Sequence, residues 1–223
     1  METFVVRVWL PDRPGALGQV ASRIGALRGD VVGIDILERG GGKAVDELVV
    51  SLPDDGLVDL LVSEIMQVDG VAVEDVRKVA SDRPDPGLVA LEVAAVLAEE
   101  PHGTRLDRLC VEIATLVDGD WVAAIDASSS VVVAGHTVEG APPDVSWLSA
   151  FLDGSRHLDH ALQAAGAPGD LAWGWLGGID ILLDRERVVV VGRRSPPFHT
   201  RERQQIALLC RMTAALIGAV EHA

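Results

Sequence analysis

The amino-acid sequence predicts an α+β protein built from two domains, and three observations carry this prediction. In residues 1–80, runs of β-branched side chains alternate with stretches whose apolar residues recur every three or four positions. Residues 81–87 contain two prolines and a glycine, which interrupt both strand and helix patterns. Residues 88–223 then alternate between helix and short strand patterns and end on a long helix. We therefore expect these three segments to be a first domain, a linker and a second domain.

Residues 4–10 form the first expected strand because β-branched, aromatic and apolar side chains dominate them. The turn at 11–15 contains two prolines and a glycine and ends this strand. A helix is expected next, since apolar side chains recur every three or four positions from Leu17 to Leu27. Gly29 suits the left-handed residue that commonly ends a helix.

Residues 31–37 and 45–52 are the next two expected strands, joined by a glycine-rich hairpin tip at 40–42. A second helix is expected after Pro53, with leucines and an isoleucine on one face, and residues 71–79 form the fourth strand. The resulting order, βαββαβ, is that of the ferredoxin-like split unit, in which four antiparallel strands carry two helices on one face.

The turn of the first domain has a specific sequence, Asp12-Arg13-Pro14-Gly15-Ala16-Leu17. An amphipathic helix follows it, and then the opening of the second strand at 29–34. This succession resembles an ACT domain, and the resemblance covers residues 3–79. ACT domains are small-molecule sensing modules, most often for amino acids. The resemblance implies a ligand at the turn between the first strand and the first helix, and pairing of the domain with a second copy.

Elementary electrostatics supports a zwitterionic ligand at this turn. A helix N-terminus presents unpaired N–H groups with partial positive charge, here around Gly15, Ala16 and Leu17, and these suit a carboxylate. Gly15 lets a ligand approach the backbone because it has no Cβ. Asp12 lies beside the same terminus and suits an ammonium group. The alternative is that Asp12 only caps the helix and that Pro14 and Gly15 only make the turn.

Two further candidate ligand contacts lie on the second strand. ACT domains often have polar side chains near the end of the first strand and the start of the second, where this chain has Leu10 and Val31. Val31 is therefore a candidate contact at which the specificity of the pocket differs from that of the family. Asp35 interrupts an otherwise apolar run and is the other candidate, although strand alternation alone would place it towards solvent.

The second domain is expected to combine three long helices with five short strands around an irregular middle. The expected helices are residues 88–99, 104–117 and 200–220, and the expected strands are residues 121–125, 131–134, 172–176, 178–183 and 188–191. Thr104 precedes the second helix, and an acidic residue follows it three positions later. We therefore expect Thr104 to cap that helix through its side chain.

The end of the second domain has the most specific pattern of that half. A strand at 188–192 is followed by a Pro-Pro-Phe turn at 196–198 and by an apolar helix that an acidic residue opens at 200–202. This succession resembles a GAF domain, and the resemblance covers residues 88–220. It implies an α/β sandwich with an antiparallel sheet, and a ligand position between the sheet and the middle segment at 136–168.

Tryptophans and arginines of the second domain each allow two interpretations. Trp173 and Trp175 are two positions apart and so share one strand face, and Trp147 lies in the middle segment. They line a pocket or, as large rings more often do, fill the core. Arg193 and Arg194 precede the last helix and either bind an anion or form a solvated face.

Charge and composition exclude several classes of partner. The chain has 19 Lys and Arg against 34 Asp and Glu, which gives a formal net charge of −15. This charge repels nucleic acids and anionic membranes, so neither is an expected partner. We expect a cytoplasmic protein, because the start lacks a signal-peptide pattern and no apolar run reaches the roughly 18–20 residues of a membrane span. Two distant cysteines, Cys110 and Cys210, do not form a disulfide framework and are expected in neighbouring helices.

Catalytic and metal-binding patterns are not evident. The sequence has no Gly-x-Ser-x-Gly elbow and no phosphate-binding loop. His157 and His160 lie one helical turn apart, but a third ligand is lacking, and the pair is typical of a surface. We therefore expect no enzymatic activity, no metal and no cofactor.

The leading functional hypothesis is a non-catalytic regulatory protein that binds an amino acid or similar metabolite through its first domain and acts through its second. We also expect it to pair with its own copies through the ACT-like domain and to regulate a partner protein. The alternative is an oligomerisation or interaction module that regulates a partner without any small ligand. An enzyme that uses a tryptophan-lined pocket is the third class and has the least support.

Overall fold

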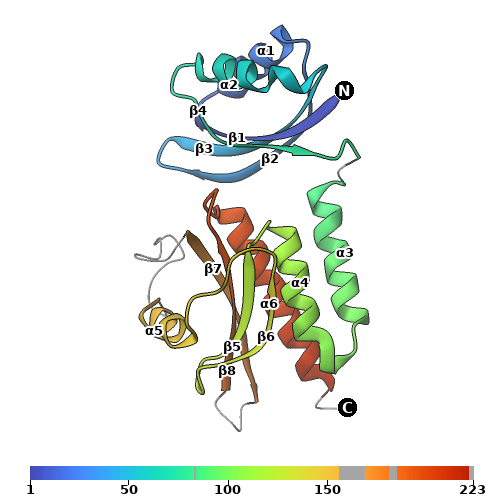
Figure 1. The fold of residues 1–223 in the computed structure, drawn as a ribbon, viewed down its shortest axis with the longest axis vertical. Coiled ribbons are helices and arrows are strands. Elements are labelled where there is room, and N and C mark those ends of the chain that lie inside the picture. The colour runs from blue at the N-terminus through green and yellow to red at the C-terminus, as the bar shows by residue number, and fades with distance from the viewer. Residues whose placement is uncertain (83, 156–168, 181–184, 221–223) are drawn as a thin grey trace. The chain divides into compact units, whose positions relative to one another are not determined.

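The computed structural model describes residues 1–82, 84–155, 169–180 and 185–220 (Figure 1). The chain divides into two compact units, and each contains a four-stranded antiparallel sheet. The first unit comprises Met1–Pro84 together with the short segment His199–Arg201. The second comprises Asp85–Phe198 together with Glu202–Ala223. The α+β class predicted from the sequence is therefore confirmed.

The first unit has the predicted βαββαβ order. Its elements are β1 (Glu2–Pro11), α1 (Ala16–Ala26), β2 (Asp30–Gly40), β3 (Lys43–Leu52), a short 3-10 helix (Asp55–Leu57), α2 (Val58–Met66) and β4 (Ala72–Val79). The strands lie side by side in the order β2-β3-β1-β4, and both helices cover one face of the sheet (Figure 1). β2 and β4 are therefore its edge strands.

Strand alternation places every second side chain of β1 and β3 under the two helices. These side chains pack against the inner faces of α1 and α2 in one buried cluster. The cluster includes Phe4, Val6, Val8, Leu10, Ala44, Leu48, Val50 and Leu52 from the strands and Val20, Ile24, Leu61 and Ile65 from the helices. The face of the sheet that carries the helices is thus the apolar one.

The end of α1 differs from its prediction. Arg28, with a φ of 58°, adopts the left-handed conformation there, and Gly29 does not. A Cβ on Gly29 would lie 2.9 Å from Cδ2 of Leu52 and 3.0 Å from Cγ2 of Ile24. Gly29 is therefore required by the close approach of the chain to α1 and β3, and a positive φ is not the reason.

The second unit is a layered arrangement of one sheet between helices. Its elements are α3 (Pro86–Glu99), a 3-10 helix (His102–Thr104), α4 (Arg105–Leu116), β5 (Trp121–Asp126), β6 (Val131–Thr137), α5 (Val145–Ser155), β7 (Asp170–Asp180), β8 (Arg185–Arg193) and α6 (Thr200–Val220). The strands lie in the order β6-β5-β8-β7. Helices α3, α4 and α6 pack on one face, and α5 packs on the other (Figure 1).

Two predictions for the second unit are corrected by the structure. Residues 172–176 and part of 178–183 belong to one strand, β7, with a register irregularity between Trp175 and Gly177. Two consecutive apolar runs therefore form one bent strand, and residues 181–184 lie outside the described ones. Thr104 does not cap α4 through its side chain, because its hydroxyl donates to the Glu100 carboxylate at 2.6 Å. Within the described ranges, every helix is too short or too polar to cross a membrane.

Candidate functional site

The turn between β1 and α1 leaves a helix N-terminus open. Gly15 occupies the N-cap position with a φ of 87°, and no side chain caps the helix there. The first turn of α1 also contains no acidic residue that would offset the partial positive charge of its N–H groups. A Cβ built on Gly15 would meet no atom within 4 Å, so the space beside the backbone is open. These features suit the approach of a small anionic group.

Asp12 does not cap the helix, which removes one of the two interpretations considered for it. Its backbone N–H donates to the carbonyl oxygen of Gly42 at 3.0 Å, and this bond ties the turn to the start of β3. The side chain is exposed. Its carboxylate makes no hydrogen bond or ion pair with the described residues, so it can meet a cation from solvent.

Asp46 is the residue of this region that sequence reasoning missed. It lies on β3 between Ala44 and Leu48, and the alternation of the strand turns its side chain towards the helices. Only 4% of Asp46 is exposed, and its Oδ1 has no hydrogen-bond partner. Burial raises the pKa of Asp46, the charge of Asp12 raises it further, and that of Arg39 lowers it. Asp46 is thus a buried acid whose Oδ1 has no partner, and the charge of Asp12 in the β1–α1 turn acts on it.

The neighbours of Asp46 in the sheet are apolar. Val8 of β1 and Ile36 of β2 lie opposite it in the two ladders that flank β3. Ile34 pairs with Leu48, so Ile34 and Ile36 lie on the helix-bearing face of the edge strand. They remain 48% and 41% exposed. The signal that would have revealed Asp46 is a single carboxylate in the buried register of an otherwise apolar strand.

Four of the predicted site residues lie in the turn at 12–17, where the chain itself makes them neighbours, and the other two lie on β2. Ala16 is 1% exposed, and its amide donates to the carbonyl oxygen of Arg13 at 3.3 Å. Leu17 packs its side chain against the core, so its backbone amide is the group that a ligand could meet. Val31 packs against the same core from β2. Asp35 pairs with Glu47 in the ladder, which places it on the face opposite the helices, where Arg201 forms an ion pair with its carboxylate.

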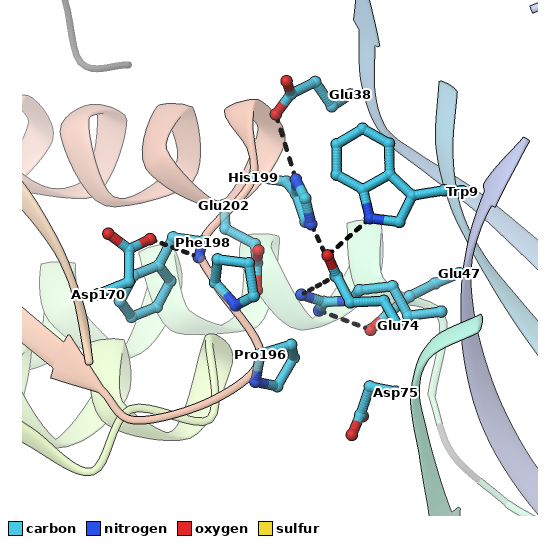
Figure 2. A network of polar contacts seen from close by, with 12 residues as sticks. Trp9, Glu38, Glu47, Glu74, Asp75, Asp170, Pro196, Phe198, His199 and Glu202 are labelled. Carbon is cyan, nitrogen blue, oxygen red and sulfur yellow. Dashed lines mark hydrogen bonds and ion pairs between the residues drawn. The ribbon is translucent and has the colours of Figure 1, made fainter. Parts of the chain in front are cut away.

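The face opposite the helices carries a second cluster, and its charges are paired. Arg7, which is 2% exposed, donates to the Glu47 carboxylate at 2.8 Å, and Arg77 donates to the same oxygen at 3.1 Å. Glu74 accepts a hydrogen bond of 2.8 Å from Nε1 of Trp9. Figure 2 shows Trp9, Glu47 and Glu74 of this cluster on neighbouring strands. Because each buried acid here has cationic or N–H partners, the cluster is compensated.

His199, from the short segment of the first unit, extends this compensated cluster. Its Nε2 lies 2.8 Å from Oε2 of Glu74, and its Nδ1 lies 3.2 Å from Oε2 of Glu38 (Figure 2). The imidazole also meets the Trp9 ring edge to face at 5.5 Å. Although burial opposes the charged form, the hydrogen bonds and charge of Glu74 and Glu38 raise the pKa of His199. The cluster therefore favours a protonated imidazole held between two carboxylates.

Arg193 of the second unit forms part of the core, which decides between its two interpretations. It is 3% exposed and donates to the carbonyl oxygens of Val117, Pro196 and Pro197 and to the Glu202 carboxylate. Arg194 is exposed and pairs with acids at its end of the sheet. Arg193 is thus fully engaged in holding the turn before α6 and offers no donor arrangement for an external anion.

The aromatic and thiol side chains of the second unit also fill its core. Trp173 is 5% exposed, and both it and Trp175 face the cluster under α5, as their spacing predicted. Phe151 of α5 meets the Trp173 ring edge to face at 5.5 Å. Cys110 and Cys210 share the core cluster on the opposite face, and burial raises the pKa of Cys110 to about 12. A thiol with such a pKa stays protonated near neutrality and is a poor nucleophile.

Within the described ranges, no group of three or more His, Cys, Asp and Glu side chains is arranged to hold a metal ion. His157 and His160, which the sequence offered as a pair, lie outside those ranges. The features at and around the β1–α1 turn are an open helix N-terminus, the exposed carboxylate of Asp12 and the buried carboxylate of Asp46.

No protein-family model matches the chain, and no curated protein matches it. Solved structures that resemble it include the ACT domain of a GTP pyrophosphokinase from Chlorobium tepidum, with 16% identity over 35% of this chain and 100% of that one and a TM-score of 0.29.

Two other solved structures show likeness of the same kind. The C-terminal domain of the MgtC protein from Mycobacterium tuberculosis is 16% identical over 38% of this chain and 95% of that chain, with a TM-score of 0.31. An unknown protein from Galdieria sulphuraria is 13% identical over 99% of this chain and 92% of that chain, with a TM-score of 0.34. TM-scores of this size do not establish a relationship, so the proposed function rests on the residues of this chain.

Proposed function

We propose that this protein is a non-catalytic, cytoplasmic regulatory protein whose first unit is an ACT-like sensor of an amino acid or a similar small zwitterion. The observation that carries the proposal is the uncapped N-terminus of α1 at Gly15, in the turn that also carries the exposed Asp12, whose charge acts on the buried Asp46. The helix terminus suits the ligand carboxylate, and the two acids suit its ammonium group. The βαββαβ order and the turn sequence support the ACT assignment.

The second unit is proposed to be a GAF-like module that passes the bound state of the sensor to a regulated partner protein. Its central antiparallel sheet with helices on both faces supports this assignment. The buried tryptophans and Arg193 of this unit have structural contacts, and the proposal assigns recognition of the ligand to the first unit. Neither a cofactor nor a catalytic step forms part of the proposal.

Equilibrium binding with a panel of amino acids tests the sensor proposal. Wild-type protein is expected to bind at least one member, and Gly15→Val is expected to abolish binding, because valine does not tolerate a φ of 87° and would narrow the open space. Gly18→Val is the matched control, since Gly18 also meets no atom within 4 Å of its ideal Cβ but has no positive φ. No binding to wild type, or equal binding by both variants, would contradict the proposal.

A second candidate function is that of an interaction module that pairs without a ligand. The edge strand β2 favours it, because Val32, Ile34 and Ile36 are all exposed along an edge that has no neighbouring strand among the described residues. Pairing of this edge with a second copy would cover these side chains. Light scattering with and without amino acids separates the two functions, since a ligand-independent dimer that binds no amino acid supports the interaction module.

A further inference from the structure

Asp46 has no structural function that its contacts explain. A carboxylate that is removed from water without a hydrogen bond destabilises the fold, and ordinary proteins pair such groups or replace them. The opposite charge that acts on Asp46 is that of Arg39, whose side chain is exposed and forms no ion pair with the described residues. An asparagine or a valine would fill the same position in the apolar series of β3 at lower cost. The oxygen without a hydrogen-bond partner therefore indicates that a ligand binds at Asp46.

We propose that Asp46 is the ammonium-binding residue of the sensor site and that its ligand is an amino acid with a short aliphatic side chain. This inference rests on the proposed function and names the ligand class of the same site. Asp46 supplies the buried oxygen, and Asp12 adds negative charge from the exposed side. An ammonium group carries three donors and can serve both acids, whereas a hard divalent cation requires about six oxygen ligands.

The surroundings of Asp46 define the remaining parts of the ligand. Ile34 and Ile36 offer exposed apolar surface on the same face of β2, and Ile36 lies directly opposite Asp46. An aliphatic side chain of the ligand would cover this surface and gain the free energy of apolar burial. Arg39 and the open amides at Gly15 offer positive charge for the carboxylate. The two carboxylates, the positive charge and the apolar patch together match a zwitterion with an aliphatic side chain.

Entry of the ligand requires a local movement. Oδ1 of Asp46 is covered by protein atoms, so an ammonium group reaches it only after a neighbouring side chain or the 12–15 turn shifts. The exposed residues of this turn and the exposed Arg39 can move without disturbing the core. Binding is therefore expected to protect the amides of this turn from hydrogen exchange.

Calorimetry on the full chain with L-leucine and two of its analogues tests the inference. One analogue, 4-methylpentanoate, lacks the amine, and the other, 3-methylbutylamine, lacks the carboxylate. Wild type is expected to bind leucine and, more weakly, the amine, and not to bind 4-methylpentanoate. L-Valine and L-isoleucine are measured beside leucine, because the apolar patch fits any of the three.

The variant Asp46→Asn keeps the shape of the side chain and removes its charge. It is expected to weaken leucine binding by about tenfold or more, which corresponds to the loss of a charged hydrogen bond. Asp30→Asn, at an exposed position where β2 begins, is the matched control and is expected to bind as wild type does. Thermal melting of Asp46→Asn checks that the variant is folded.

The outcomes separate the two levels of the proposal. If wild type binds none of the three amino acids, the aliphatic ligand class is overturned, and binding of another amino acid would still support the sensor function. If leucine binds wild type and Asp46→Asn equally, or if 4-methylpentanoate binds as well as leucine, Asp46 is not the ammonium-binding residue and the sensor proposal stands. The analogue series uses wild type alone, so it decides the question even if the variant does not fold.

Discussion

Asp46 and Glu47 are neighbours on β3 with opposite electrostatic environments. Both are buried, at 4% and 6% exposure, but they point to opposite faces of the sheet. Glu47 accepts hydrogen bonds from Arg7 and Arg77, whereas Asp46 has an oxygen without a partner. A buried acid that the fold compensates belongs to the architecture. One that the fold leaves uncompensated costs stability, and it is the better candidate for binding a ligand.

The largest expected effect comes from removing the cation of the compensated face. Arg7→Met leaves the Glu47 carboxylate buried with fewer donors, so we expect the free energy of unfolding to fall by about 3 kcal/mol. Urea unfolding followed by circular dichroism measures this change. A decrease below about 1 kcal/mol would mean that Arg77 and the other contacts compensate the charge of Glu47 without Arg7. The two faces would then differ less in charge compensation than the geometry indicates.

Glu47→Gln removes the charge of the compensated acid and leaves its shape. We expect a loss of about 1–2 kcal/mol, because the buried Arg7 guanidinium then has a neutral acceptor in place of a carboxylate. The same urea experiment measures it. An unchanged or increased stability would mean that Glu47, like Asp46, is a buried acid whose charge the fold does not compensate.

Asp46→Asn is the matched change on the other face, and its expected sign is opposite. We expect the free energy of unfolding at neutral pH to rise by about 1 kcal/mol, because the variant no longer buries an uncompensated charge. The prediction is made for protein without an amino acid in the buffer. A loss of stability would show that the carboxylate has a partner that stabilises the fold.

The pH dependence of stability distinguishes Asp46 further. Its pKa is raised by burial from an ordinary value of 3.8, so the folded chain holds this proton more tightly than the unfolded chain. The penalty is absent below the ordinary pKa and grows as the pH rises through the raised value. Wild type should therefore lose stability over this window relative to Asp46→Asn. Parallel curves for the two proteins would contradict a raised pKa.

The smallest expected effect on stability comes from the apolar patch beside Asp46. Ile34→Thr should change the free energy of unfolding by no more than about 0.5 kcal/mol, because Ile34 is half exposed on an edge strand that tolerates threonine. It should nevertheless weaken leucine binding. If it disrupts a dimer instead and leaves binding unchanged, the patch is an interface and the interaction module is the better function.

Much of the first unit could be predicted from the sequence because its signals are local. The spacing of apolar residues predicted both helices and all four strands, and the turn sequence predicted where α1 begins. Gly29 was correctly singled out, but for the wrong reason, because the approach of Leu52 is a contact between distant segments. The predicted site residues at the turn are neighbours in the chain, and their binding of a ligand stays a prediction. Asp35 lies on the face opposite the helices, because pairing with β3 set the face on which it lies.

The second unit was less predictable because its signals depend on packing. Arg193 looked like a surface residue in a chain rich in arginine, and the structure buries it among three carbonyl oxygens and Glu202. Thr104 had the spacing of a cap, but a nearer acceptor, Glu100, takes its hydroxyl. In both cases the sequence contains the donor, and only the fold determines which acceptor it meets.

The sequence by itself determined the order of elements, the helix-bearing face of the first sheet and the location of the β1–α1 turn, because periodicity and turn residues act over a few positions. It did not determine which buried acid would have a partner. Asp46 and Glu47 are adjacent in the chain, and the pairing of β1 and β2 with β3 places Val8 and Ile36 beside one and Arg7 beside the other. Charge compensation depends on neighbours across the sheet, and only the tertiary structure decides those.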